Sequence, residues 1–149
     1  MNKEIVKTSN FSENEFIRLY CAINFKKQLP PIIKHEELEK ELYKFYFYPD
    51  FEKLFQDISL KRDYANPEYS YLDLGRAINV AQIYGLLIPV HDVGEVKSII
   101  SCNKKLAEKI ISTTDAEMVK KMNDLFDMMF NLTENKEDQQ LIMIKKNRL

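Results

Sequence analysis

One stretch of this sequence constrains the fold more than any other, because a helical pattern runs directly into a hairpin pattern there. Residues 71–84 carry apolar side chains at helical spacing, and Gly85 stands where a helix ends in a left-handed residue. Residues 86–90 and 96–101 are rich in aliphatic and β-branched side chains, and the residues between them favour a turn. The sequence therefore predicts a helix followed by a β-hairpin, with Ser70 as the N-cap of the helix.

Other helices are predicted on both sides of this stretch. The first is marked by a capping box formed by Ser12 and Glu15, and the last by a second one formed by Thr114 and Glu117. Residues 61–69 contain an Asn-Pro pair and are expected to form a loop. The expected helices cover residues 13–27, 35–48, 50–59, 103–112 and 115–132.

These elements predict a mainly α fold with one small β-hairpin, in a chain of a length that suits a single domain. The order of elements at 71–101 resembles the end of a winged helix-turn-helix domain. We expect the chain to divide into a flexible arm at 1–10, a helical domain with the hairpin at 11–113, a long helix at 114–133 as a C-terminal helical extension, and a polar and basic tail at 134–149.

Charge and cysteine usage restrict the class of protein. The 22 basic and 23 acidic residues give a net charge of −1, so no overall field attracts nucleic acid or a membrane surface. Cys21 and Cys102 lack the spacing of a redox or metal motif, which favours a reducing compartment. No apolar run reaches the length of a membrane span, and residues 1–10 lack the apolar core of a signal peptide. A cytoplasmic protein without a membrane partner is expected.

Catalytic chemistry has little support in the sequence. The two histidines, His35 and His91, belong to no metal-binding or nucleophile motif, and the three glycines are too isolated to form a phosphate-binding loop. The carboxylates lie in polar, helix-starting contexts that leave them solvated. We therefore expect no enzyme activity, no catalytic or metal-binding residue, no cofactor and no small-molecule substrate.

DNA binding is the alternative that the winged-helix resemblance implies. The helix at 71–84 would then enter a major groove, with the hairpin as its wing. Its charge argues against this, because Asp73 offsets Arg76, and the apolar Leu72 and Ile83 would face the groove. A helix that is apolar on both faces is better interpreted as the structural centre of the domain. The candidate contacts to DNA are Arg76, Asn79, Gln82, Lys97, Lys104 and Lys105.

Binding to a protein partner or to a second copy of the chain fits the same facts more easily. Methionines and a leucine in the last long helix recur at the alternating spacing of a coiled-coil seam, and such methionine-rich surfaces adapt to partners. The same seam also fits the core of the chain itself. We expect a small regulatory or inhibitory protein, whose candidate interface consists of Met118, Met122, Leu125, Met129, Leu72 and Ile83.

Overall fold

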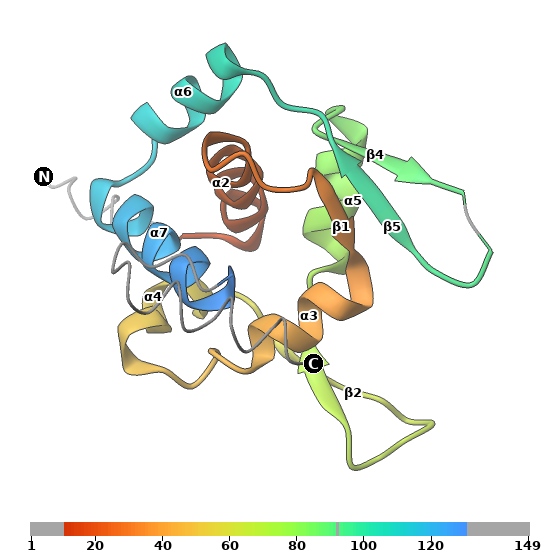
Figure 1. The fold of residues 1–149 in the computed structure, drawn as a ribbon. Coiled ribbons are helices and arrows are strands. Elements are labelled where there is room, and N and C mark those ends of the chain that lie inside the picture. The colour runs from red at the N-terminus through yellow and green to blue at the C-terminus, as the bar shows by residue number, and fades with distance from the viewer. Residues whose placement is uncertain (1–10, 92, 131–149) are drawn as a thin grey trace, which may run out of the picture.

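The other elements of the fold surround one central helix, α2 (Glu13–Lys26) (Figure 1). The computed structural model describes residues 11–91 and 93–130, so the expectations for the arm at 1–10 and the tail at 134–149 lie outside the described residues. The described part consists of six α-helices and two small antiparallel sheets, and about half of it is helical. It is thus mixed α/β, and the prediction of a mainly α fold with a single hairpin missed three strands.

Helix α2 begins where the sequence predicts it. Glu15 N donates to Ser12 Oγ at 3.2 Å and Ser12 N donates to Glu15 Oε1 at 2.8 Å, which confirms the capping box. Its buried side chains surround most of the helix, because other elements cover it on several sides. This helix, and not the one predicted at 71–84, is therefore the structural centre. Its buried residues are Phe16, Ile17, Leu19, Tyr20, Cys21, Ala22, Ile23 and Asn24.

A three-stranded sheet lies beside α2, with the strand order β1–β5–β4 (Figure 1). The strands β4 (Leu87–Val90) and β5 (Lys97–Ile100) confirm the predicted hairpin, and Pro89 lies in the edge strand β4, where a proline is tolerated. Strand β1 (Ile32–Lys34) was missed because it is only three residues long and follows two prolines. Three isoleucines, each 41–48% exposed, form a row across the outer face of the sheet: Ile32, Ile99 and Ile88.

Two predicted helices are shorter in the structure. Helix α3 (His35–Tyr43) stops before the aromatic run that follows it, and the predicted helix at 50–59 is reduced to the 3-10 turn η1 (Pro49–Phe51) and α4 (Glu52–Phe55). The aromatic rings between them pack against each other; for example, the Phe45 and Phe51 rings lie 6.3 Å apart. Backbone hydrogen bonds continue here between residues three apart, for example from Phe45 N to Leu42 O at 2.9 Å, so tight turns with packed rings replace the predicted helix.

The region around residue 70 differs most from the prediction. Strands β2 (Leu60–Arg62) and β3 (Ser70–Leu72) form a second hairpin, so Ser70 is not a helix cap. Helix α5 (Gly75–Ile83) begins four residues later than predicted, after Leu74, whose N–H donates to the buried Glu39 carboxylate at 3.0 Å. A side chain from α3 therefore fixes the start of α5, which a local reading of the sequence does not reveal.

Two helices complete the described chain. Helix α6 (Lys104–Ser112) is capped by Asn103, whose Oδ1 accepts a hydrogen bond from Leu106 N at 2.8 Å. Helix α7 (Ala116–Phe130) begins as expected, but the predicted Thr114 capping box is wrong. The carboxylate of Asp115 accepts the hydrogen bonds there, while the Thr114 hydroxyl donates back to Ile110.

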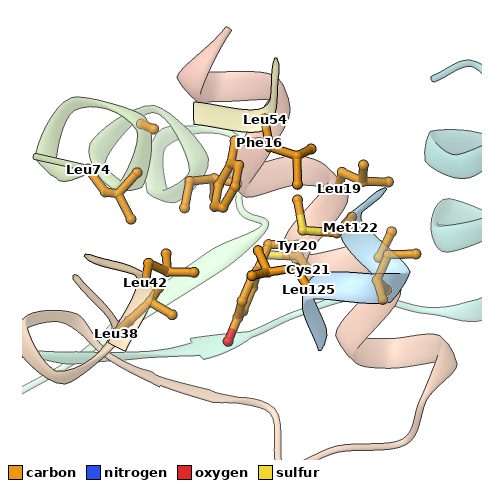
Figure 2. Close-up of a cluster of buried hydrophobic side chains, with 14 of the residues drawn as sticks. Phe16, Leu19, Tyr20, Cys21, Leu38, Leu42, Leu54, Leu74, Met122 and Leu125 are labelled. Carbon is orange, nitrogen blue, oxygen red and sulfur yellow. The ribbon is translucent and has the colours of Figure 1, made fainter. Parts of the chain in front are cut away.

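Helix α7 packs against α2 and closes the core (Figure 2). The Tyr20 and Phe126 rings lie 4.7 Å apart, and Met122 and Leu125 are fully buried in the same cluster. One turn earlier on α2, Phe16 contacts Phe55 of α4 at a ring separation of 5.4 Å. The described helices thus share one continuous hydrophobic core.

Candidate functional site

The candidate site is a groove between α2, α5 and α6, which we call the α2–α5–α6 groove. Its volume is about 520 Å³, within the range of sites that take a small ligand or the side chains of a partner. Apolar side chains line most of it, and the two polar side chains come from α2. The lining residues are Asn14, Arg18, Ala77, Val80, Ala81, Tyr84, Gly85, Leu86, Leu106 and Ile110.

Local structure explains why the groove is apolar and open. Helix α5 faces it with the small side chains of Ala77 and Ala81, which leave space that larger residues would fill. Helix α6 faces it with Leu106 and Ile110, four residues apart and therefore on one side of the helix. Leu106 remains half-buried, so part of this apolar wall is in contact with solvent.

The end of α5 forms the rim of the groove. Gly85 has φ +81°, a left-handed conformation that ends the helix and turns Leu86 back into the core. Just before this turn, Ile83 is 80% exposed and Tyr84 is 83% exposed. Ile83 lies three residues after Val80 of the groove lining, so the apolar surface continues from the groove onto the exposed end of α5.

Two polar side chains on α2 lack partners within the described chain. Arg18 is exposed and makes no hydrogen bond or ion pair with another described residue, so its guanidinium can bind a carboxylate. The Oδ1 atom of Asn14 is buried without a hydrogen-bond partner, which leaves an acceptor for an incoming N–H or O–H. The groove thus combines an apolar wall with one cation and one acceptor.

The residues predicted to form a protein interface are mostly buried in the core of the described chain. Met118, Met122 and Leu125 pack inside it, and Met129 is half-buried against it. Leu72 lies in strand β3 and not on a helix face, and it is fully buried. Ile83 alone of this set is exposed, at the rim of the α2–α5–α6 groove.

The predicted DNA contacts are scattered over three elements. Exposed Arg76 lies 3.7 Å from Glu13, and Gln82 donates to the Ser98 hydroxyl at 3.1 Å, so both already have partners within the chain. Asn79 is exposed on α5, and Lys97 lies half-buried on β5. Lys104 and Lys105 are exposed in the first turn of α6.

The titratable groups near the core favour their neutral forms. Burial raises the pKa of the Cys21 thiol and, to a lesser extent, that of Cys102, so neither thiol is activated as a nucleophile. Burial lowers the pKa of His35. Among the described residues, no group of three or more histidines, cysteines and carboxylates is placed to hold a metal ion.

Sequence patterns did not indicate the groove residues on α2 and α6. Asn14 and Arg18 look like ordinary solvent-facing positions of an amphipathic helix, and Leu106 looks like part of the buried face of α6. The four-residue spacing of Asn14 and Arg18 places them on one side of α2, but only the packing of α5 and α6 shows that this side borders a groove.

Comparison with protein-family models, with curated proteins and with solved structures finds no match to this chain. The described helices include none that combines the length and the apolar character needed to cross a bilayer. The functional conclusion therefore depends on the geometry of the groove and its rim.

Proposed function

We propose that this chain is a small, non-catalytic regulatory or inhibitory protein that binds a protein partner through the α2–α5–α6 groove. The observation that carries the proposal is the exposure of Ile83 and Tyr84 beside an apolar groove of about 520 Å³. Large exposed side chains at the end of a helix that borders a cavity are typical of a recognition surface, since tyrosine and neighbouring apolar anchors contribute strongly to binding.

The partner that fits this groove is an amphipathic segment with a carboxylate. Its apolar side chains would pack against Leu106 and Val80, as in helix-in-groove recognition. Its carboxylate would pair with Arg18, and one of its N–H or O–H groups would donate a hydrogen bond to Oδ1 of Asn14. A cytoplasmic setting fits the two free cysteines, Cys21 and Cys102.

Affinity capture from the native host with two matched variants tests this proposal. Ile83→Asp places a charge at the rim of the groove, whereas Ile88→Asp places the same charge on the outer face of the sheet, where Ile88 is 48% exposed. We expect the wild type and Ile88→Asp to retain the same protein, and Ile83→Asp to lose it. Calorimetry with the purified partner then measures how much binding affinity is lost in Ile83→Asp, Tyr84→Ala and Arg18→Glu. Equal losses for Ile83→Asp and Ile88→Asp would contradict the proposal.

DNA binding is the second candidate, supported by the helix α5 that leads into the β4–β5 hairpin, and by exposed Arg76 and Asn79 on that helix. Arg76 would first have to leave Glu13, and exposed Ile83 would have to meet a charged groove. Mobility shifts at low salt with DNA from the region upstream of the gene test this candidate. Binding that Arg76→Ala weakens would support it, and absence of a shift would exclude it under those conditions.

A further inference from the structure

A second groove lies along the free edge of β1, on the side away from β5, and we call it the β1 groove. Its volume is about 370 Å³. It is bordered by α2, by the start of α3 and by the last turn of α7, and it is separate from the α2–α5–α6 groove. The residues used in the argument below are Tyr20, Asn24, Ile32, Glu37, Met129 and Phe130.

The backbone of β1 presents unpaired groups to this groove. Pro31 O accepts from Ile100 N at 2.8 Å, and His35 N donates to Val96 O at 3.0 Å, so these positions face β5. Successive residues of a strand point their N–H and C=O groups to opposite sides. The N–H and C=O of Ile32 therefore face away from β5, where no described strand pairs with them. An unpaired edge of this kind binds an added strand.

A buried acceptor lies in the same groove. Asn24 is 3% exposed, and its Nδ2 donates to Pro30 O at 3.4 Å. Its Oδ1 is buried and has no hydrogen-bond partner within the described chain. Buried acceptors without a partner are rare in native structures, so a donor carried by an added segment would satisfy this atom.

We propose that residues 141–144 of this chain, Leu-Ile-Met-Ile, bind in the β1 groove as an added strand paired with β1. Alternate side chains of a strand point to opposite faces. Two of the four would enter the groove against Tyr20 and Met129, and the other two would extend the exposed row of Ile32, Ile99 and Ile88. Both faces of the new strand would thus meet apolar surface, which explains why all four residues are apolar.

The charges on the two segments are complementary. Lys145, Lys146 and Arg148 follow the apolar run, and no acidic residue occurs in 141–149. Glu37, Glu41 and Lys34 line the groove. Lys34 lies 4.0 Å from Glu95 and Glu41 pairs with Lys44 at 3.1 Å, whereas Glu37 forms no ion pair with another described residue. Attraction between these groups favours the orientation that brings the basic residues toward α3.

The chain between α7 and this run is long enough to reach the groove. Phe130, the last described residue, itself lines the groove, and Leu141 follows eleven residues later. Eleven extended residues span up to about 36 Å. A tether of this length gives an effective concentration on the order of millimolar, so that even weak pairing of a short strand is populated.

Hydrogen exchange on the full chain tests the proposal directly, because it reads both partners of the pairing. We expect slowed exchange for amides within 142–145 and for the amide of Ile32. Truncation after Gln140 should speed exchange at Ile32 several-fold. Ile142→Asp with Ile144→Asp should do the same, whereas Leu132→Asp, a single change of the same kind outside the run, should not. Fast exchange of 142–145 in the wild type, or unchanged protection of Ile32 in the double variant, would overturn the proposal.

A peptide of residues 139–149 provides an independent readout with the chain truncated after Gln140. We expect the peptide to bind the truncated chain, and Glu37→Lys to weaken this binding more than Glu68→Lys, which changes an exposed carboxylate in the loop between β2 and β3. Absence of binding would overturn the proposal. If the full chain has a dimeric mass and the protection of the Ile32 amide disappears on dilution, a second copy supplies the strand. That result would also overturn docking within one chain.

Discussion

The hydroxyl of Ser98 connects three elements: its Oγ lies 2.8 Å from Nε2 of His35 in α3, and it accepts a hydrogen bond from Gln82 Nε2 in α5 at 3.1 Å. Ser98 is fully buried on the inner face of β5. A single hydroxyl thus joins the sheet to the two helices that cover it.

Replacing this hydroxyl should destabilise the fold. Ser98→Ala leaves the half-buried Gln82 amide and His35 ring without their common partner, and the loss of two hydrogen bonds of about 0.5–1.5 kcal/mol each costs about 1–3 kcal/mol. We expect the free energy of unfolding in urea to fall by that amount. Ser101→Ala, which removes an exposed hydroxyl just beyond the same strand, should change it by less than about 0.5 kcal/mol. Equal effects of the two substitutions would contradict the role given to Ser98.

The environment of His35 also predicts a dependence of stability on pH. Burial lowers the pKa of its imidazole in the folded chain below 6.5, so the unfolded chain binds the proton more readily. The contribution of the neutral ring to stability is therefore complete above pH 6.5 and decreases as the pH falls from there toward the folded pKa. Urea titrations of the wild type and His35→Gln between about pH 5 and pH 8 check this. As the pH falls, the unfolding free energy of the wild type should decrease relative to that of His35→Gln.

Glu39 offers a test in which charge and hydrogen bonding are separated. Burial raises the pKa of its carboxyl, while the hydrogen bond from Leu74 N opposes that shift. Glu39→Gln keeps an acceptor for Leu74 N and removes a buried charge, so we expect equal or higher stability at pH 7. Glu39→Ala removes the acceptor at the start of α5 and should lower the unfolding free energy by about 1–3 kcal/mol. A loss of stability with Glu39→Gln equal to that with Glu39→Ala would show that the charge itself is needed.

The methionines of α7 distinguish a core from an interface. Met122 is fully buried in the core, whereas Met128 is 43% exposed. Met122→Ala should lower the unfolding free energy of the isolated chain by about 2–5 kcal/mol, as expected for a buried methionine. Met128→Ala should change it by less than about 0.5 kcal/mol. If both variants unfolded at the wild-type urea concentration, the burial of Met122 in the core would be contradicted.

The sequence predicts those helix ends and turns that depend only on residues close together in the chain. The capping box of Ser12 and Glu15, the left-handed Gly85 and the turn between residues 90 and 96 each fix a structure from within a few residues. Helix boundaries that depend on distant partners were not predictable in this way. The start of α5 is an example, since it depends on a carboxylate from α3, 35 positions away in the chain.

The candidate groove was harder to predict, because a groove is a property of packing. Ala77 and Ala81 look like small core residues in the sequence, and only the distance at which α6 packs leaves space beside them. The predicted interface on α7 shows the reverse case. Its heptad-like spacing was read correctly as a packing surface, but the spacing does not distinguish a second chain from the α2 helix of the same chain.

The pairing of β1 with β5 has a consequence for synthesis on the ribosome. His35, which directly follows β1, and Ser98 of β5, to which its ring hydrogen-bonds, are 63 positions apart in the chain. Any nascent fragment that ends before Lys97 lacks the strand that pairs with β1 in the described fold. Since closing so long a loop costs entropy before its contacts form, the sheet is completed late in folding. Until then the exposed Ile32–Ile33 pair is a site where a chaperone can bind the growing chain.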